Sequence, residues 1–134
     1  MPRIVIFLDL DDTILQTAPK CPPAEPVEPA AVDRAGRALS FMTRAQRRLL
    51  AFWLERGTVI PVTGRTDEAL ARVTLKFESW RITHHGAVIR QPGGRLPIWW
   101  HDEIRPLLVA AQPLLWEYAA SLERDAATEG YRVR

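Results

Sequence analysis

The sequence of 134 residues is poor in cysteine and has no long hydrophobic run. Its single cysteine, Cys21, excludes an internal disulfide and is typical of a reducing compartment, so we expect a cytoplasmic protein. No apolar stretch has the length of a signal peptide or a membrane span, so we expect no membrane partner. Nearly all basic residues are arginines, and they are scattered apart from Arg44, Arg47 and Arg48. These three would share one helix face, which favours a solvated surface over a nucleic-acid patch.

An apolar run over residues 4–8 stops abruptly at three carboxylates, Asp9, Asp11 and Asp12. The run is rich in β-branched residues and predicts a strand buried on both faces, in the middle of a parallel sheet. Alternation along an extended chain points Asp9 and Asp11 the same way and turns Leu10 inward. Converging carboxylates are costly unless a cation or a shared proton compensates, and Mg²⁺ prefers such oxygen ligands. The segment therefore indicates a metal site or an acid–base site.

The segment Asp9-Leu10-Asp11-Asp12-Thr13 resembles the first signature, Asp-x-Asp-x-Thr/Val, of the haloacid-dehalogenase-like (HAD-like) phosphohydrolases. The resemblance implies that Asp9 attacks phosphorus to form an aspartyl-phosphate and that Asp11 is the general acid/base. It implies Mg²⁺ bound by Asp9 and by the backbone carbonyl of Asp11, with phosphate also bound at Leu10. Asp12 and Thr13 would contact substrate or support the site. The alternative is an acidic turn that caps a strand.

Residues 58–65 predict a second strand that ends in Thr63-Gly64-Arg65, followed by residues 66–68 opening a helix. A hydroxyl, free N–H groups and a helix N-terminus at one strand end suit a phosphate. In the resemblance, Thr63 is the second signature and hydrogen-bonds the phosphoryl oxygen, with Gly64 beside it. The continuation to Arg65 is similar to the Thr/Ser-Gly-Arg of sugar-phosphate phosphatases, where it implies a role at the substrate. The alternative is that the threonine only caps the helix.

Between these motifs, residues 16–31 hold five of the eleven prolines and predict an extended loop, either a flap over the site or a plain linker. Thr43 predicts the N-cap of an amphipathic helix that ends at Gly57. After the second motif, residues 69–77 predict a short helix and residues 80–83 a third strand.

The next segment, His84-His85-Gly86-Ala87-Val88-Ile89, resembles the Asn-Gly-Ala-x-Ile turn of the Cof-like and sucrose-phosphatase-like branches, which starts a small hairpin. His85 stands where those branches have Asn, and we expect it near the substrate or the flap.

The C-terminal part predicts a long helix with Asp102 as its N-cap, a kink or break at Pro113 and an end at Gly130. Residues 131–134 alternate like the start of another strand. The superfamily's third signature, a lysine, and its fourth, an acidic pair, have no counterpart here. Lys76 falls late in a predicted helix, away from the strand ends.

We therefore expect an α/β fold: a partial Rossmann-like HAD core of three parallel strands with flanking helices and a hairpin, truncated before its last strands. Residues 1–100 would form the first half of that core, and residues 101–134 a helix and the start of a cap domain. The first strand would have a bare edge, through which two copies could pair.

The expected activity is Mg²⁺-dependent hydrolysis of a phosphomonoester through an aspartyl-phosphate. Its substrate would be a small phosphorylated metabolite, with a sugar phosphate favoured. Without the lysine and the acidic pair, this chain alone could be inactive. The alternative is a non-catalytic phosphate-binding or interaction module.

Overall fold

The computed structural model describes residues 4–130 and divides the chain into two units, one ending at Pro97 and one starting at Ile98. The sequence predicts this boundary after residue 100. The strand predicted at residues 131–134 lies outside the described residues. No helix among the described residues is both long and apolar enough to cross a membrane.

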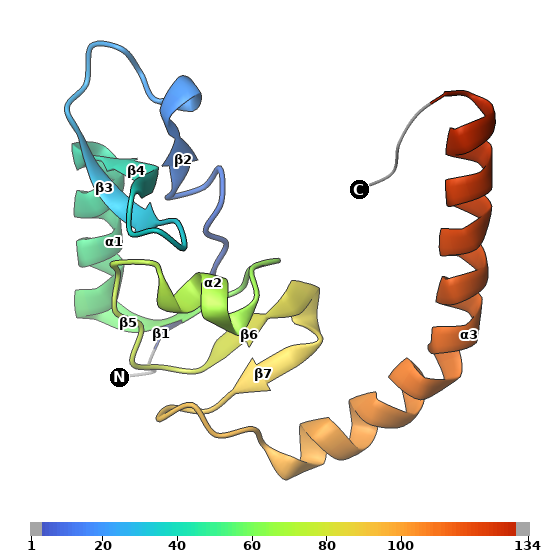
Figure 1. Ribbon diagram of the computed structural model, residues 1–134. Coiled ribbons are helices and arrows are strands. Elements are labelled where there is room, and N and C mark those ends of the chain that lie inside the picture. The colour runs from blue at the N-terminus through green and yellow to red at the C-terminus, as the bar shows by residue number, and fades with distance from the viewer. Residues whose placement is uncertain (1–3, 131–134) are drawn as a thin grey trace. The chain divides into compact units, whose positions relative to one another are not determined.

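The elements of the first unit are, in order, β1 (Ile4–Leu8), β2 (Gln16–Thr17), the 3₁₀ turn η1 (Ala18–Lys20), β3 (Val27–Val32), β4 (Ala38–Thr43), α1 (Arg44–Arg56), β5 (Gly57–Pro61), α2 (Asp67–Ala71), β6 (Arg81–Thr83), the 3₁₀ turn η2 (His84–Gly86) and β7 (Val88–Arg90) (Figure 1). The second unit is the helix α3 (Ile98–Thr128).

A parallel arrangement of β1, β5 and β6 forms the centre of the first unit. β1 pairs in parallel with β5, with Leu8 opposite Pro61. β6 joins the other side of β5 through a parallel bridge between Val62 and Ile82. An antiparallel hairpin of β6 and β7 follows. The fold is thus mixed α/β with parallel strands, as the sequence predicts. The hairpin predicted to follow the third strand instead includes that strand, β6, as its first arm.

The prediction that β1 is buried on both faces is wrong. Leu8 is buried and Ile6 packs partly against the core, whereas Val5 and Phe7, which point to the opposite face, are 52% and 66% exposed. Only one face of β1 meets the core, and β5 is its only neighbour among the described strands. One edge of β1 therefore carries no partner in the described part of the chain.

Pro61 is an unusual residue for a strand inside a sheet. The N–H of the next residue, Val62, donates to the Leu8 carbonyl at 2.8 Å. By alternation, the nitrogen of Pro61 faces away from β1, on the side where β6 has not yet begun. The proline therefore removes no ladder hydrogen bond between β1 and β5.

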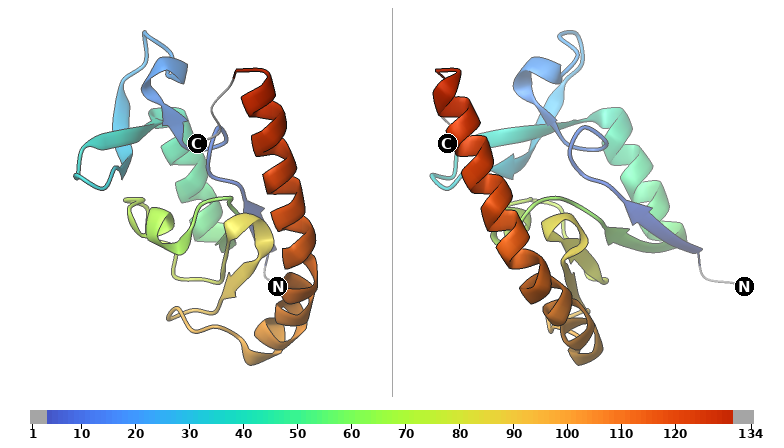
Figure 2. Two further views of the ribbon diagram at one scale, coloured as in Figure 1. Left: turned by 45° about the vertical axis from the view of Figure 1, so that its right-hand side comes forward. Right: turned by 90° about the vertical axis from the view of Figure 1, so that its right-hand side faces the viewer.

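The prediction of an extended loop over residues 16–31 is wrong for β2 and β3. Both strands pair antiparallel with β4, in the order β2-β4-β3. The strand tolerates Pro29 because the register shifts between Pro29 and Ala31, which interrupts the regular ladder at the proline. Figures 1 and 2 show this sheet beyond the C-terminal end of β1. We call the three strands β2, β4 and β3 the flap sheet.

The helix α1 begins where the sequence predicts. The Thr43 hydroxyl accepts from the Gln46 N–H at 3.2 Å, and the Gln46 side chain accepts from the Thr43 N–H at 2.9 Å, which makes a capping box. The Gln46 amide also donates to the Thr13 carbonyl at 3.0 Å. Gly57 is the C-cap and directly starts β5. The helix start is therefore tied to the loop that carries the carboxylates.

The helix α2 is shorter than predicted and ends at Ala71. Beyond it, Val73 bridges to Ala31, and the Thr74 N–H donates to the Ala30 carbonyl at 2.9 Å. Pairing with β3 thus replaces the helix that residues 69–77 would otherwise continue. The same contacts place Val73 and both alanines in the core.

The helix α3 differs from prediction at its start and in its middle. It begins at Ile98, so Asp102 lies inside it and is not the N-cap. In its first turn the Trp99 ring packs edge-to-face against the Trp100 ring, with the ring centroids 5.9 Å apart. The helix continues through Pro106 and Pro113, and Figure 1 shows its axis bending rather than breaking, as prolines cause. Gly130 closes it as predicted, with φ +79°.

Candidate functional site

The carboxylates after β1 and the Thr63-Gly64-Arg65 segment after β5 emerge side by side. Leu8 lies opposite Pro61, so both parallel strands end at the same edge of the sheet. Ligands bind at this edge in open α/β sheets. β6 ends there too, because the Thr63 N–H donates to the Ile82 carbonyl at 2.9 Å.

The carboxylate loop is tightly wound around Leu10. The Leu10 side chain is fully buried, as the sequence predicts, and its carbonyl accepts from three consecutive N–H groups, of Thr13, Ile14 and Leu15, at 3.3, 3.0 and 2.8 Å. Asp12 takes a left-handed conformation at φ +61°. Ile14 and Leu15 anchor the loop in the core. The three carboxylates thus stand on a fixed backbone.

Each of the three carboxylates has a different partner. Asp9 accepts from the Thr13 hydroxyl at 2.7 Å, and Asp12 pairs with Lys20 at 2.6 Å. Asp11 binds Arg65 through two hydrogen bonds, from Nε at 2.8 Å and from Nη2 at 2.6 Å. Two of the three carboxylates are therefore paired with cations. Asp9 has no cationic partner among the described residues.

Arg65 lies at the centre of the site and joins it to the flap sheet. Its side chain is only 13% exposed, and Nη2 also approaches the buried Ser40 hydroxyl of β4 at 3.3 Å. Its N–H donates to the Thr63 hydroxyl at 3.1 Å, and its carbonyl accepts from the His84 N–H at 2.9 Å. Hydrogen bonds therefore fix both the backbone and the side chain of Arg65, and together they hold its guanidinium in place.

Thr63 and Thr66 have separate roles in the structure. Thr66 caps α2, since its hydroxyl accepts from the Ala69 N–H at 3.1 Å. Within residues 4–130, the hydroxyl of the buried Thr63 accepts from the Arg65 N–H and makes no other hydrogen bond, so its hydrogen can be donated to a ligand. The short α2 carries acidic residues in its first turn and adds little positive potential. The positive charge at this corner comes from Arg65.

The His85 ring packs directly on Gly64. A Cβ at Gly64 would lie 2.7 Å from His85 Nε2 and 2.8 Å from Nδ1, closer than any real contact. Three successive residues, His84, His85 and Gly86, have φ of +53°, +55° and +96°, which folds the chain back over the strand end. Two of them are not glycine, and such backbone strain is concentrated at functional sites.

Asp67 forms a second charged cluster beside the site. It accepts from the Thr83 hydroxyl at 2.9 Å and from Arg90 Nε at 2.6 Å. Burial alone raises the pKa of Asp67, but the hydrogen bonds from Arg90 and Thr83 outweigh it, so its pKa is lowered. The sequence shows Asp67 only as part of a helix start, because its partners lie on β6 and β7.

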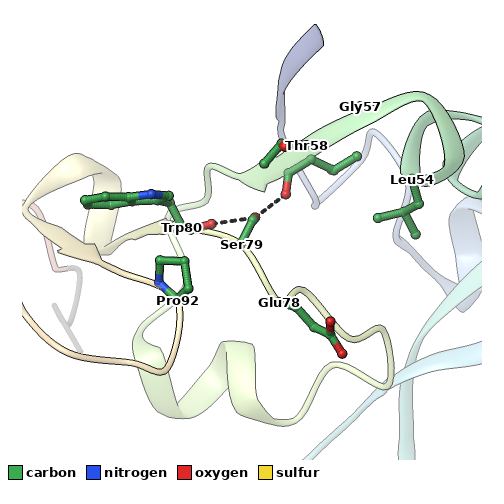
Figure 3. A pocket seen from close by; sticks show the side chains of 8 residues that line it. Leu54, Gly57, Thr58, Glu78, Ser79, Trp80 and Pro92 are labelled. Carbon is green, nitrogen blue, oxygen red and sulfur yellow. Dashed lines mark hydrogen bonds between the residues drawn. The ribbon is translucent and has the colours of Figure 1, made fainter. Parts of the chain in front are cut away.

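The first unit carries several cavities, among them two of similar size at different places on the parallel strands and the hairpin. One of about 510 Å³ is lined by Gly57, Thr58, Ser79 and Trp80 (Figure 3), at the end of β5 remote from the carboxylates. The other, of about 550 Å³, is lined by Arg34 and by residues of α2, η2 and β7 that include Asp67. The second cavity adjoins the segment that follows Arg65.

The oxygen atoms at the end of β1 suit a hard cation. Among residues 4–130 no group of three or more His, Cys, Asp or Glu side chains is placed to hold a metal. The Asp9 carboxylate and the Asp11 carbonyl, which accepts no hydrogen bond from the described residues, are two such oxygens. Mg²⁺ commonly takes one or two protein ligands and completes its shell with water and substrate phosphate.

No model of a known protein family matches the chain, and no curated protein matches it.

Proposed function

We propose that this chain is a cytoplasmic, Mg²⁺-dependent phosphomonoesterase of the HAD-like type, acting on a small phosphorylated metabolite such as a sugar phosphate. The observation that carries the proposal is the Asp11–Arg65 pair. It joins the Asp-x-Asp loop after β1 to the Thr-Gly-Arg segment after β5, although the two residues are 54 positions apart. The two motifs that resemble the superfamily's first and second signatures therefore share one strand edge.

In the proposed reaction, a carboxylate oxygen of Asp9 attacks phosphorus and the ester oxygen leaves, taking a proton from Asp11. Asp11 then removes a proton from water, whose oxygen attacks phosphorus and releases phosphate and free Asp9. The Thr63 hydroxyl and the N–H groups near Leu10 and Gly64 would bind the phosphoryl oxygens. Mg²⁺, held by Asp9 and the Asp11 carbonyl, would supply charge stabilisation for phosphoryl transfer.

The remaining site residues would contact or enclose the substrate. Asp12 and Thr13 brace the loop, through Lys20 and Asp9 respectively. His85 covers Gly64, where it could contact the phosphate ester. The cavity beside Asp67 has room for the organic part of a small metabolite.

One observation favours a second function, a non-catalytic phosphate-binding or interaction module. The described residues bring no further acidic pair to the strand edge, and neither lysine is free there: Lys20 is paired with Asp12, and Lys76 lies beside a different cavity with Arg81. Phosphate could then bind at Thr63 and Arg65 without being transferred.

Turnover of p-nitrophenyl phosphate distinguishes the two functions. We expect the chain to release p-nitrophenol with Mg²⁺ and to lose this activity with EDTA. Asp9→Asn should lower kcat by at least about 10³-fold, because it removes the nucleophile. Thr17→Ala, an exposed change outside the site, serves as the control. Absence of turnover together with binding of inorganic phosphate would support the non-catalytic module instead.

A further inference from the structure

The cation at the site, Arg65, is already paired with a carboxylate, that of Asp11. Arg65 is the guanidinium nearest the phosphate corner, and two of its N–H groups are used by one carboxylate. A guanidinium binds carboxylate and phosphate in the same two-point geometry. The carboxylate of Asp11 therefore stands where two oxygens of a phosphoryl group could stand.

The two partners of this pair are held very differently. The Arg65 side chain is 13% exposed and contacts Ser40, while its backbone is fixed by Thr63 and His84. The Asp11 side chain is 51% exposed. If the pair opens, Asp11 can turn into water while Arg65 stays in place. Asp11 is thus the partner that can leave.

We propose that Arg65 is the phosphate-binding cation of this site and that Asp11 is its internal substitute ligand, displaced when a phosphoryl group binds. The inference rests on the proposed function in taking this strand edge as the phosphate site. A phosphate monoester carries about −1.5 to −2 charges at pH 7, against −1 for a carboxylate, so it competes well for the guanidinium. Displacement would also free Asp11 to reach the leaving oxygen.

This assigns Arg65 two tasks that no single motif indicates. Without ligand, it neutralises one of three adjacent carboxylates and holds the loop against the flap sheet through Ser40. With ligand, it binds the phosphate and releases the acid/base. Substrate binding and release of Asp11 are then one event, so Asp11 is freed only when a phosphoryl group is present.

The test is the affinity for inorganic phosphate, measured by calorimetry without Mg²⁺, in the full chain and its variants. Asp11→Asn removes the competing carboxylate and should tighten phosphate binding about tenfold, the scale of one partly exposed ion pair. Asp12→Asn removes the same charge from the next residue, which pairs with Lys20 instead. It should change the affinity less than about threefold.

Arg65→Lys should weaken binding at least about tenfold, since a lysine cannot reproduce the two-point contact. In the Arg65→Lys background, adding Asp11→Asn should raise the phosphate affinity only slightly. Urea unfolding of each variant checks the fold, and if Arg65→Lys is unfolded the comparison of Asp11→Asn with Asp12→Asn still decides. Equal effects of these two variants, or unchanged binding in a folded Arg65→Lys, would overturn the inference, as would a failure of every variant to bind phosphate.

The inference and the proposed function fail in different ways. Binding that depends on Arg65 without any turnover of p-nitrophenyl phosphate supports the inference and refutes hydrolysis. Turnover that depends on Asp9, with phosphate affinity indifferent to Arg65, supports hydrolysis and overturns the inference.

Discussion

At the scale of single residues, the close approach of Gly64 and His85 decides the shape of the backbone just after Thr63. The backbone of Gly64 lies against the imidazole ring with no space for a Cβ. A side chain at this position must push away either the ring or the strained turn that carries it. The smallest residue is therefore required at the point where a phosphate would meet the backbone.

Gly64→Ala should lower the free energy of unfolding by about 1–3 kcal/mol, because the added methyl overlaps the His85 ring. In a His85→Ala background, the same change should cost less than about 1 kcal/mol, since the obstructing ring is gone. Urea unfolding of the four proteins measures this coupling. Equal costs in both backgrounds would show that the ring is not what excludes a side chain.

Local signals in the sequence predict individual residues well and pairs poorly. The turned-in Leu10 and the cap at Thr43 were predictable because each depends on a few neighbouring residues. The pairing of Asp11 with Arg65 joins residues 54 positions apart, and the Ser40 contact spans 25. No periodicity carries such information, so the partners of a site residue emerge only from the fold.

At the scale of elements, Asp67 connects α2 to the hairpin of β6 and β7. Its carboxylate accepts from Thr83 at the end of β6 and from Arg90 at the end of β7. The sequence predicts the hairpin but gives α2 too many residues, because pairing of the following segment with β3 replaces helix. Elements set by tertiary pairing are those that local propensity misplaces.

Asp67→Asn should lower the free energy of unfolding by about 1–2 kcal/mol at pH 7, because it removes the charge from these hydrogen bonds. The folded-state pKa of Asp67 is lowered, so its contribution is present above the unfolded pKa and is lost as the pH falls through the folded pKa. The difference from the unmutated protein should therefore shrink below about pH 4.

Urea unfolding at pH 7 and pH 3 measures this loss. Glu68→Gln, on the exposed side of the same helix, is the control and should have little effect at either pH. A difference for Asp67→Asn that is independent of pH would mean that its charge does not hold the hairpin.

At the scale of the whole molecule, one edge of β1 is paired with no other strand of the described chain. The Leu8 carbonyl accepts from Val62, so by alternation Val5 and Phe7 turn their backbone groups away from β5. Both side chains are also exposed. An unpaired strand edge of this kind is a template for a second chain.

We therefore expect two copies to associate through β1, with a concentration-dependent mass in analytical ultracentrifugation. Val5→Pro should weaken this association at least about tenfold, because it removes an edge N–H without touching the ladder to β5. Ile6→Pro is the contrast: it removes a ladder N–H and should destabilise the fold itself. A monomer at all concentrations, or a dimer unaffected by Val5→Pro, would contradict this expectation.

The attachment of the flap sheet restricts which of its parts can move. β3 is joined at its base to the segment after α2, where Val32 donates to Arg72 at 3.1 Å and Thr74 to Ala30 at 2.9 Å. The sheet cannot swing away as a whole while these bonds persist, which leaves motion to its tip between η1 and β3. Loop-tip motions take nanoseconds to microseconds, against microseconds to milliseconds for the closure of a hinged domain. Entry and exit of a small ligand would then be faster than turnover in a typical enzyme, and its residence time would be set by its contacts at the strand edge.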